Sequence, residues 1–179
     1  MKTPKLETER LVLRAFDVND TEAVFCGWES DPEVARYMCW SSHNDIEKTR
    51  EWIEFEINQI DKEDWYRWAI VKKNSGELLG TCLIYYDKES LTYEVSYNLC
   101  RKFWGFGYIS EAMQEAIKFA KEELKITKLF GSHAKVNQAS ENVLKKLGFT
   151  YIRDCAYDCG GKFQTEGKTY QLDLGDSIV

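Results

Sequence analysis

Two glycines separated by one residue, at the start of a helical pattern, constrain the fold of this chain more than any other feature. They lie in the stretch Trp104-Gly105-Phe106-Gly107-Tyr108. Glycine leaves the backbone N–H groups free to converge on an anion. A helix N-terminus adds up to four unpaired donors and about half a positive charge. The stretch therefore predicts a phosphate-binding turn between a strand and a helix.

The segments on either side of this turn show the expected patterns. Apolar and polar side chains alternate from Thr92 to Leu99, so that Glu94, Ser96 and Asn98 share the polar face of a strand. After the turn, apolar residues recur at helical spacing, at Ile109, Ala112, Met113, Ala116, Ile117 and Leu124. A strand with a polar face thus leads into the glycine turn, and an amphipathic helix leaves it.

The rest of the chain alternates between strands and helices. Strands are also expected at 11–16, 68–71, 78–86, 128–135, 149–155 and 168–174. Helices are expected at 21–30, after the capping residues Asn44 or Asp45, and at 137–147, where Gly148 ends the helix. This order predicts a single mixed α/β domain over residues 1–179, with about seven strands, mostly antiparallel, and about four helices. The glycine-turn helix makes one parallel crossover.

The charge and hydropathy of the chain limit its partners. The net charge of −6 argues against nucleic-acid binding, which normally uses a basic face, and is compatible with a cationic substrate such as an amine. No run of about 18 apolar residues occurs, so no membrane span is expected. The segment from Met1 to Glu7 lacks the apolar core of a signal peptide. We therefore expect a cytoplasmic protein.

Cysteine and histidine residues bear on disulfides and metal binding. The chain has six cysteines, none in a C-x-x-C pair, and its only two histidines, His43 and His133, are far apart in the sequence. We therefore expect no metal site, and free or buried thiols at Cys26, Cys39, Cys82, Cys100, Cys155 and Cys159.

Two common phosphate-binding motifs do not fit. A dinucleotide-binding turn needs G-x-G-x-x-G, but Ser110 stands at the third glycine position, and no acidic residue follows at the end of a second strand. The segment Gly167-Lys168-Thr169 is similar to the end of a P-loop. Lys162 stands at its first glycine position, however, and a strand pattern follows it.

The remaining pattern is basic-x-x-G-x-G, from Lys102 to Gly107. Here the chain resembles the GNAT superfamily of N-acetyltransferases, whose pyrophosphate loop is usually Q/R-x-x-G-x-G/A. Lys102 is a mild departure at its first position. Other segments are similar, in the same order, to the branch that acetylates the N-termini of ribosomal proteins; they are Thr8 to Arg14, Trp68 to Gly80, Tyr108 to Ala112, Asn137 to Ser140, and Lys146 to Phe149.

The resemblance implies acetyl-CoA as the cosubstrate and indicates how it binds. Backbone N–H groups from Trp104 to Tyr108 hold the pyrophosphate, and Lys102 adds charge. The pantetheine arm runs beside the fourth predicted strand, which splays from the fifth, so that an N–H group among residues 98–100 faces the thioester oxygen. The implied binding residues are Asn98, Leu99, Cys100, Lys102, Phe103, Trp104, Gly105, Phe106, Gly107, Tyr108 and Asn137.

The resemblance also implies two catalytic residues. Glu94 is the candidate general base, because many members carry a glutamate at this position of the strand. Many relatives have a tyrosine acid at the position of Leu144, so Ser140 is the nearest hydroxyl that can take its part. Asn137 either contacts the pantetheine amide or caps the helix that follows it. Without the resemblance, Glu94 and Ser140 read equally as ordinary strand and helix residues.

The acceptor is less well defined. Aromatic residues of the N-terminal half either line an acceptor groove or belong to a helical core; they are Trp28, Trp40, Trp52, Trp65 and Tyr66. The implied reaction is direct transfer to a primary amine, either a protein N-terminal α-amine or a small amine such as an antibiotic or a polyamine. The alternatives are a non-catalytic acyl-CoA sensor and a protein–protein interaction module. The resemblance further implies a homodimer.

Overall fold

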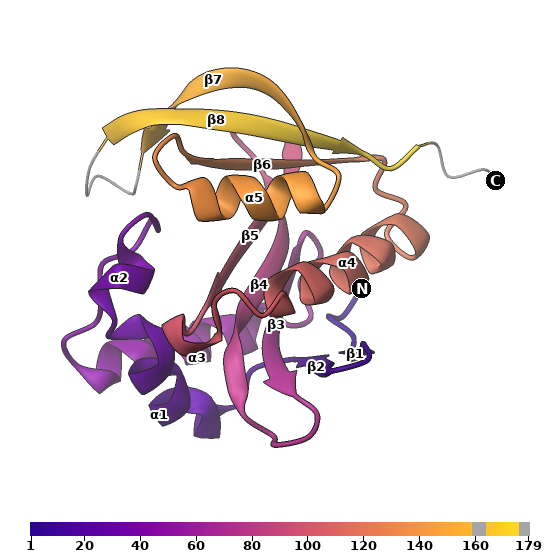
Figure 1. Ribbon diagram of the computed structural model, residues 1–179. Coiled ribbons are helices and arrows are strands. Elements are labelled where there is room, and N and C mark those ends of the chain that lie inside the picture. Colours follow the sequence, from indigo (N-terminus) through magenta and orange to yellow (C-terminus); the bar gives the residue numbers. More distant parts are fainter. Residues whose placement is uncertain (159–163, 176–179) are drawn as a thin grey trace.

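One mixed sheet organises the computed structural model, which describes residues 1–158 and 164–175 (Figure 1). Its strand order is β1-β2-β3-β4-β5-β6-β8-β7, and every neighbouring pair is antiparallel except β5 and β6. The strands are β1 (Leu6–Glu7), β2 (Leu11–Arg14), β3 (Trp65–Lys72), β4 (Leu78–Asp87), β5 (Thr92–Leu99), β6 (Lys128–Ala134), β7 (Thr150–Asp158) and β8 (Gln164–Asp173).

Helices connect these strands and begin or end where the sequence supplies caps. Asp45 accepts from the Glu47 N–H group at the start of α3, and Gly148 follows α5 with a φ of 90°. The helices are α1 (Thr21–Val24), α2 (Pro32–Ala35), α3 (Ile46–Gln59), α4 (Tyr108–Glu122) and α5 (Gln138–Lys146).

Helices cover both faces of the sheet. The ring of Trp68 lies 5.8 Å from that of Phe119 on α4, whereas Arg67, the residue before it, pairs with Glu56 of α3 at 2.8 Å. Successive side chains of a strand point to opposite faces, so α4 and α3 lie on opposite sides of β3. In Figure 1, α5 lies along β6 and β8, whereas α1 and α2 lie apart from it at the left.

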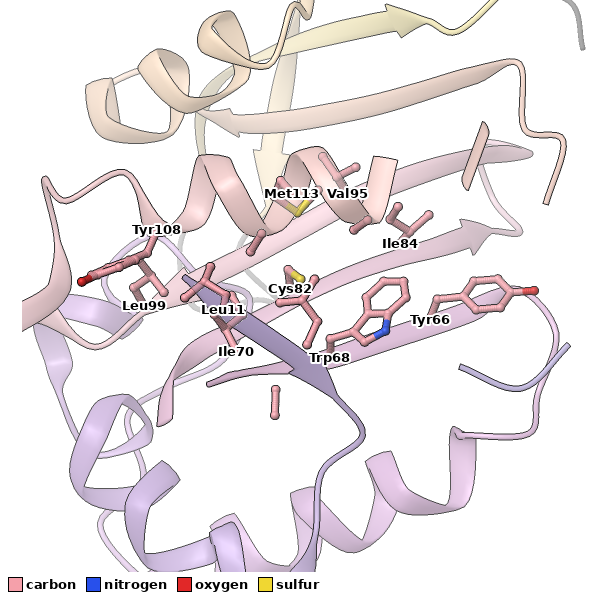
Figure 2. Close-up of a cluster of buried hydrophobic side chains, with 14 of the residues drawn as sticks. Leu11, Tyr66, Trp68, Ile70, Cys82, Ile84, Val95, Leu99, Tyr108 and Met113 are labelled. Atoms are coloured by element: carbon pink, nitrogen blue, oxygen red, sulfur yellow. The ribbon is translucent and has the colours of Figure 1, made fainter. Parts of the chain in front are cut away.

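The core on the α4 face is continuous across the sheet. Figure 2 shows Trp68, Cys82 and Met113 among the buried side chains that fill it. Burying such side chains is the main favourable term in folding. The core therefore fixes how α4, and the glycine turn before it, meet the strands.

The predicted fold class is confirmed, with corrections to single elements. The sheet has eight strands and not about seven, because β1 is a two-residue strand too short to show a pattern. The described residues contain five α-helices and not about four, because the four-residue helix α2 forms around Pro32. The helix expected at 21–30 is α1 followed by a π turn (Phe25–Glu29).

The cysteines are free thiols as far as the structure describes them. Cys82 and Cys100 are buried, Cys155 is half-buried, and Cys26 and Cys39 are exposed. Cys159 lies outside the described residues. Across the described chain, no helix combines the length and apolar character that crossing a membrane requires.

Candidate functional site

The site is a cavity where β5 and β6 diverge. Glu94 and Phe130 form the register pair of this parallel ladder, and beyond them the strands separate toward their C-terminal ends. A cavity of about 650 Å³ opens in the gap, with walls from Val95 to Leu99 on β5 and from Gly131 to His133 on β6. The predicted splay is therefore present between these strands.

The register of β5 decides which backbone donors face this cavity. The Cys100 N–H group donates to the Leu79 carbonyl of β4 at 2.8 Å, and Cys100 does not line the cavity. Backbone groups alternate in direction along a strand, so the N–H groups of Leu99 and Tyr97 point away from β4, toward the gap. The N–H of Cys100 is therefore engaged, and that of Leu99 is the available donor of the predicted segment.

The glycine turn closes one end of the cavity. Gly105 and Gly107 have φ values of 83° and 77°, which L side chains rarely adopt, and α4 begins at Tyr108. Both glycines line the cavity together with Phe103, Trp104 and Tyr108. The indole N–H of Trp104 donates to the Leu99 carbonyl at 2.9 Å, which ties the turn to the end of β5. The glycine turn therefore lies where the sequence analysis predicts it, between β5 and the start of α4.

Besides Cys100, two more residues of the predicted binding set, Lys102 and Phe106, lie outside the cavity wall. Lys102 pairs with Glu77 at 2.6 Å on the surface. Phe106 is exposed and stacks on Tyr108. The structure therefore does not bring either side chain together with the rest of the set.

Two cations that sequence reasoning missed lie at Gly107. A Cβ atom placed on this glycine would be 3.7 Å from Nζ of Lys146 and 3.8 Å from Nη2 of Arg10. Arg10 pairs with Glu111 at 2.6 Å and donates to the Phe106 carbonyl at 3.2 Å, so it braces the turn. Lys146 lines the cavity and forms no ion pair among the described residues. The sequence feature that could have identified Lys146 is its position as the first residue of the K-L-G-F element.

Glu94 lies on the face of β5 that points toward α3. Its carboxylate accepts from the hydroxyls of Tyr85 at 3.3 Å and Ser90 at 3.5 Å. Burial, with the nearby charge of Asp87, raises the pKa of Glu94 above its ordinary value. Glu94 does not line the cavity, but Ser96, the next residue on the same face, does.

The α5 side of the cavity carries Asn137 and Ser140. The Ser140 N–H group donates to Oδ1 of Asn137 at 3.2 Å, so Asn137 is the N-cap of α5. Both residues line the cavity. The Tyr97 hydroxyl lies 3.2 Å from Oγ of Ser140. Because the cap uses Oδ1, the Asn137 amide N–H₂ group is the part that could meet a ligand.

Two buried polar atoms of cavity residues have no partner among the described residues. They are Nδ2 of Asn98 and Nε2 of His133. Nδ1 of His133 donates to the Ala134 carbonyl at 2.8 Å, because a carbonyl oxygen can only accept. Burying a polar atom without a hydrogen-bond partner costs free energy. An amide chain carries both carbonyl and N–H groups, so it offers a hydrogen-bond partner of either kind to these two atoms.

The five aromatic residues considered for the acceptor groove lie outside the cavity. Trp28 is fully buried, with its indole N–H on Glu29 at 3.1 Å, and Tyr66 packs on Phe119. Neither these two nor Trp40, Trp52 and Trp65 line the cavity, whose outer wall is instead formed by Glu33, Val34, Arg36, Tyr37, Met38 and Tyr157. The core interpretation therefore holds for Trp28 and Tyr66, whereas Trp40 and Trp52 are half-buried against the core and Trp65 lies outside it.

Comparisons with known proteins agree with this geometry. Residues 10–150 match the acetyltransferase (GNAT) domain family. The uncharacterized N-acetyltransferase p20 of Bacillus licheniformis is 34% identical over 146 residues, which cover 80% of this chain and 81% of the relative.

Solved structures share the fold. The ribosomal-protein-S5-alanine acetyltransferase from Vibrio fischeri superposes with a TM-score of 0.80 at 16% identity, over 97% of this chain and 98% of that one. The microcin C7 self-immunity acetyltransferase MccE, in complex with acetyl-CoA and AMP, gives a TM-score of 0.82 at 18% identity, over 93% of each chain.

Proposed function

The chain belongs to the GNAT acetyltransferase family, and from this premise we propose that it transfers acetyl from acetyl-CoA directly to a primary amine. We further propose that the first acceptor class is the N-terminal α-amine of a protein. The resemblance of the sequence to the ribosomal-protein branch supports this choice over a small amine.

The observation that carries the proposal is the cavity between β5 and β6. It joins a glycine turn, whose N–H groups suit a pyrophosphate, to a gap beside a strand with free backbone donors. The unpaired Asn98 Nδ2 and His133 Nε2 suit the amides of a pantetheine arm. Lys146 beside Gly107 adds a positive charge for a phosphate.

When acetyl-CoA is bound, it supplies a thioester carbonyl as the electrophile. The N–H group of Leu99 or Tyr97 donates to the oxygen on which charge develops. Glu94 accepts the proton of the attacking amine, directly or through water, and burial, which raises its pKa above the ordinary value, makes it a stronger base than an exposed glutamate. Ser140 lies across the gap and donates to the departing sulphur. No covalent enzyme intermediate is required.

The outer wall of the cavity bears on the acceptor. It combines the carboxylate of Glu33 with apolar surface from Val34, Met38 and the ring of Tyr37. Glu33 pairs with Arg36 of the same wall at 3.6 Å, so the net charge of −6, and not this wall, is what favours a cationic acceptor. An amine on a flexible peptide end meets these requirements.

The test is release of free thiol from acetyl-CoA over a panel of peptides and small amines, with mass spectrometry of the acceptor. We expect turnover with peptides bearing a free α-amine and none with the same peptides blocked at the N-terminus. Turnover only with small amines would contradict the acceptor class. CoA binding without turnover on any amine would favour a sensor domain, and failure to bind CoA would contradict the proposed function entirely.

A further inference from the structure

Tyr97 reaches from β5 across the gap to α5. Its hydroxyl lies 3.2 Å from Oγ of Ser140 and 3.3 Å from the carbonyl oxygen of the same residue. Tyr97 shares a strand face with Val95, which belongs to the same buried core as Met113 of α4, so it points to the opposite side of β5 from Glu94. An amine that approaches on the Glu94 face of β5 therefore lies on the opposite face from Ser140, and the departing sulphur lies on the Ser140 face.

Helix α5 itself offers no other hydroxyl near this point of the cavity. Leu144 lies one turn after Ser140, and its side chain is buried in the core, where a Cβ placed on Gly131 would lie 2.9 Å from Cδ2 of Leu144. The tyrosine that contacts this part of the cavity therefore comes from the strand and not from the helix.

The hydrogens of this hydroxyl pair can be arranged in two ways. The Ser140 carbonyl can only accept, whereas Oγ and the Tyr97 hydroxyl can each donate or accept. Either Tyr97 donates to the carbonyl and Ser140 donates to Tyr97, or Tyr97 donates to Oγ and leaves the Ser140 hydrogen free. An anion beside Ser140 selects the second arrangement, because a thiolate has no proton to give. Burial raises the pKa of Tyr97 to about 12, so its hydroxyl keeps its proton at neutral pH.

We propose that Tyr97 is a positioning residue that turns the Ser140 hydroxyl toward the sulphur of CoA. This inference rests on the proposed function. As the N–C bond of the product forms, the C–S bond breaks and its electron pair stays on sulphur. Ser140 then donates a hydrogen bond to that sulphur while it accepts one from Tyr97. Tyr97 transfers no proton, and the proton of the amine goes to Glu94.

The test is the pKa of the thiol in the bound complex with CoA, followed by the ultraviolet absorbance of the thiolate, without any acceptor. We expect Tyr97→Phe and Ser140→Ala each to raise this pKa by about one unit, or about tenfold in the ionisation constant. The double variant should show no further rise, because the two hydroxyls act as one unit. The CoA dissociation constant should change less than about twofold.

Tyr93→Phe is the matched control. Tyr93 lies on the same face of β5, but its hydroxyl donates to Asp64 and it does not line the cavity, so the thiol pKa should stay as in the wild type. An unchanged thiol pKa in Tyr97→Phe, or additive shifts in the double variant, would overturn the role of Tyr97 and leave the proposed function standing. Failure of the wild type to bind CoA would overturn both.

Discussion

Glu94 of β5 lies opposite Phe130 of β6, where the two strands are still paired and the gap between them begins. The carboxylate therefore stands at the closed end of the divergence, and the glycine turn stands at the open end. A thioester held between them would place its carbonyl near β5, within reach of groups on both faces of that strand. This relationship underlies the predictions below.

Replacing Glu94 with Gln should lower kcat by about a hundredfold at neutral pH, because the amine would lose its proton acceptor. A base works only when deprotonated, and burial raises the pKa of Glu94, so wild-type activity should fall as pH drops through a value above the ordinary 4.5 of glutamate. The variant should lack this acidic limb. Glu89→Gln, an exposed change in the adjacent loop, should leave the pH profile of kcat intact. A wild-type profile in Glu94→Gln would show that Glu94 is not the base.

Gly107→Ala should weaken CoA binding by about tenfold or more, because alanine is strained at a φ of 77° and its methyl would approach the amine of Lys146. Gly76→Ala is the control, since Gly76 has a similar φ of 69° in the β3–β4 hairpin but open space around it. Both variants should lose about 1 kcal/mol of stability. Only Gly107→Ala should raise the CoA dissociation constant measured by calorimetry. Equal effects of the two variants on CoA affinity would show that the glycine turn does not bind CoA.

Lys146→Gln should weaken CoA binding more than Lys102→Gln does. Lys146 lies at the glycine turn and lines the cavity, whereas Lys102 is paired with Glu77 outside it. We expect a loss of several-fold, or about 1 kcal/mol, for the first, and a loss that shrinks at high salt. Titrations at two salt concentrations measure both effects. A larger loss of CoA affinity for Lys102→Gln would show that Lys102, and not Lys146, binds the phosphate.

Glu29→Gln should stabilise the protein at alkaline pH. Burial raises the pKa of Glu29 to about 7, against an ordinary value of 4.5. Below pH 4.5 the Glu29 carboxyl is protonated in both the folded and the unfolded state. Between pH 4.5 and about 7 it ionises in the unfolded state but stays protonated in the folded state, so the folded state loses stability as the pH rises. That loss is up to ~3 kcal/mol, and glutamine avoids it.

Denaturant unfolding at about pH 5 and about pH 8 measures this difference. The free energy of unfolding of the variant, relative to that of the wild type, should be larger at the higher pH than at the lower one. Glu22→Gln, an exposed change on α1, should show no such trend. A constant difference between variant and wild type would mean that Glu29 ionises normally in the folded state.

Much of the site is predictable from the sequence because its motifs are local. The glycine turn, the alternation along residues 92–99 and the cap at Asn137 each depend on neighbouring residues, and the structure has the turn, the strand and the cap in place. The two-residue strand β1 and the four-residue helix α2 carry too few residues to show a period, so they were missed.

What escaped prediction depends on contacts between distant segments. Which N–H group of β5 faces the cavity is set by its register with β4, through the bond from Cys100 to Leu79. Arg10 meets Glu111 across 101 residues, and Tyr97 meets Ser140 across 43. No spacing rule relates such pairs, because sheet order and helix packing bring them together only in the folded chain.

The most direct test of the account is a calorimetric titration of CoA into the wild type and two tryptophan variants of α5. Ala139 is exposed and lines the cavity, so Ala139→Trp should fill the path of the ligand without disturbing the core. Its neighbour Gln138 is exposed but does not line the cavity, which makes Gln138→Trp the matched control. We predict that the wild type and Gln138→Trp bind CoA alike, and that Ala139→Trp binds about a hundredfold more weakly, or about 3 kcal/mol. Equal affinity in all three proteins would contradict the placement of acetyl-CoA between β5 and β6.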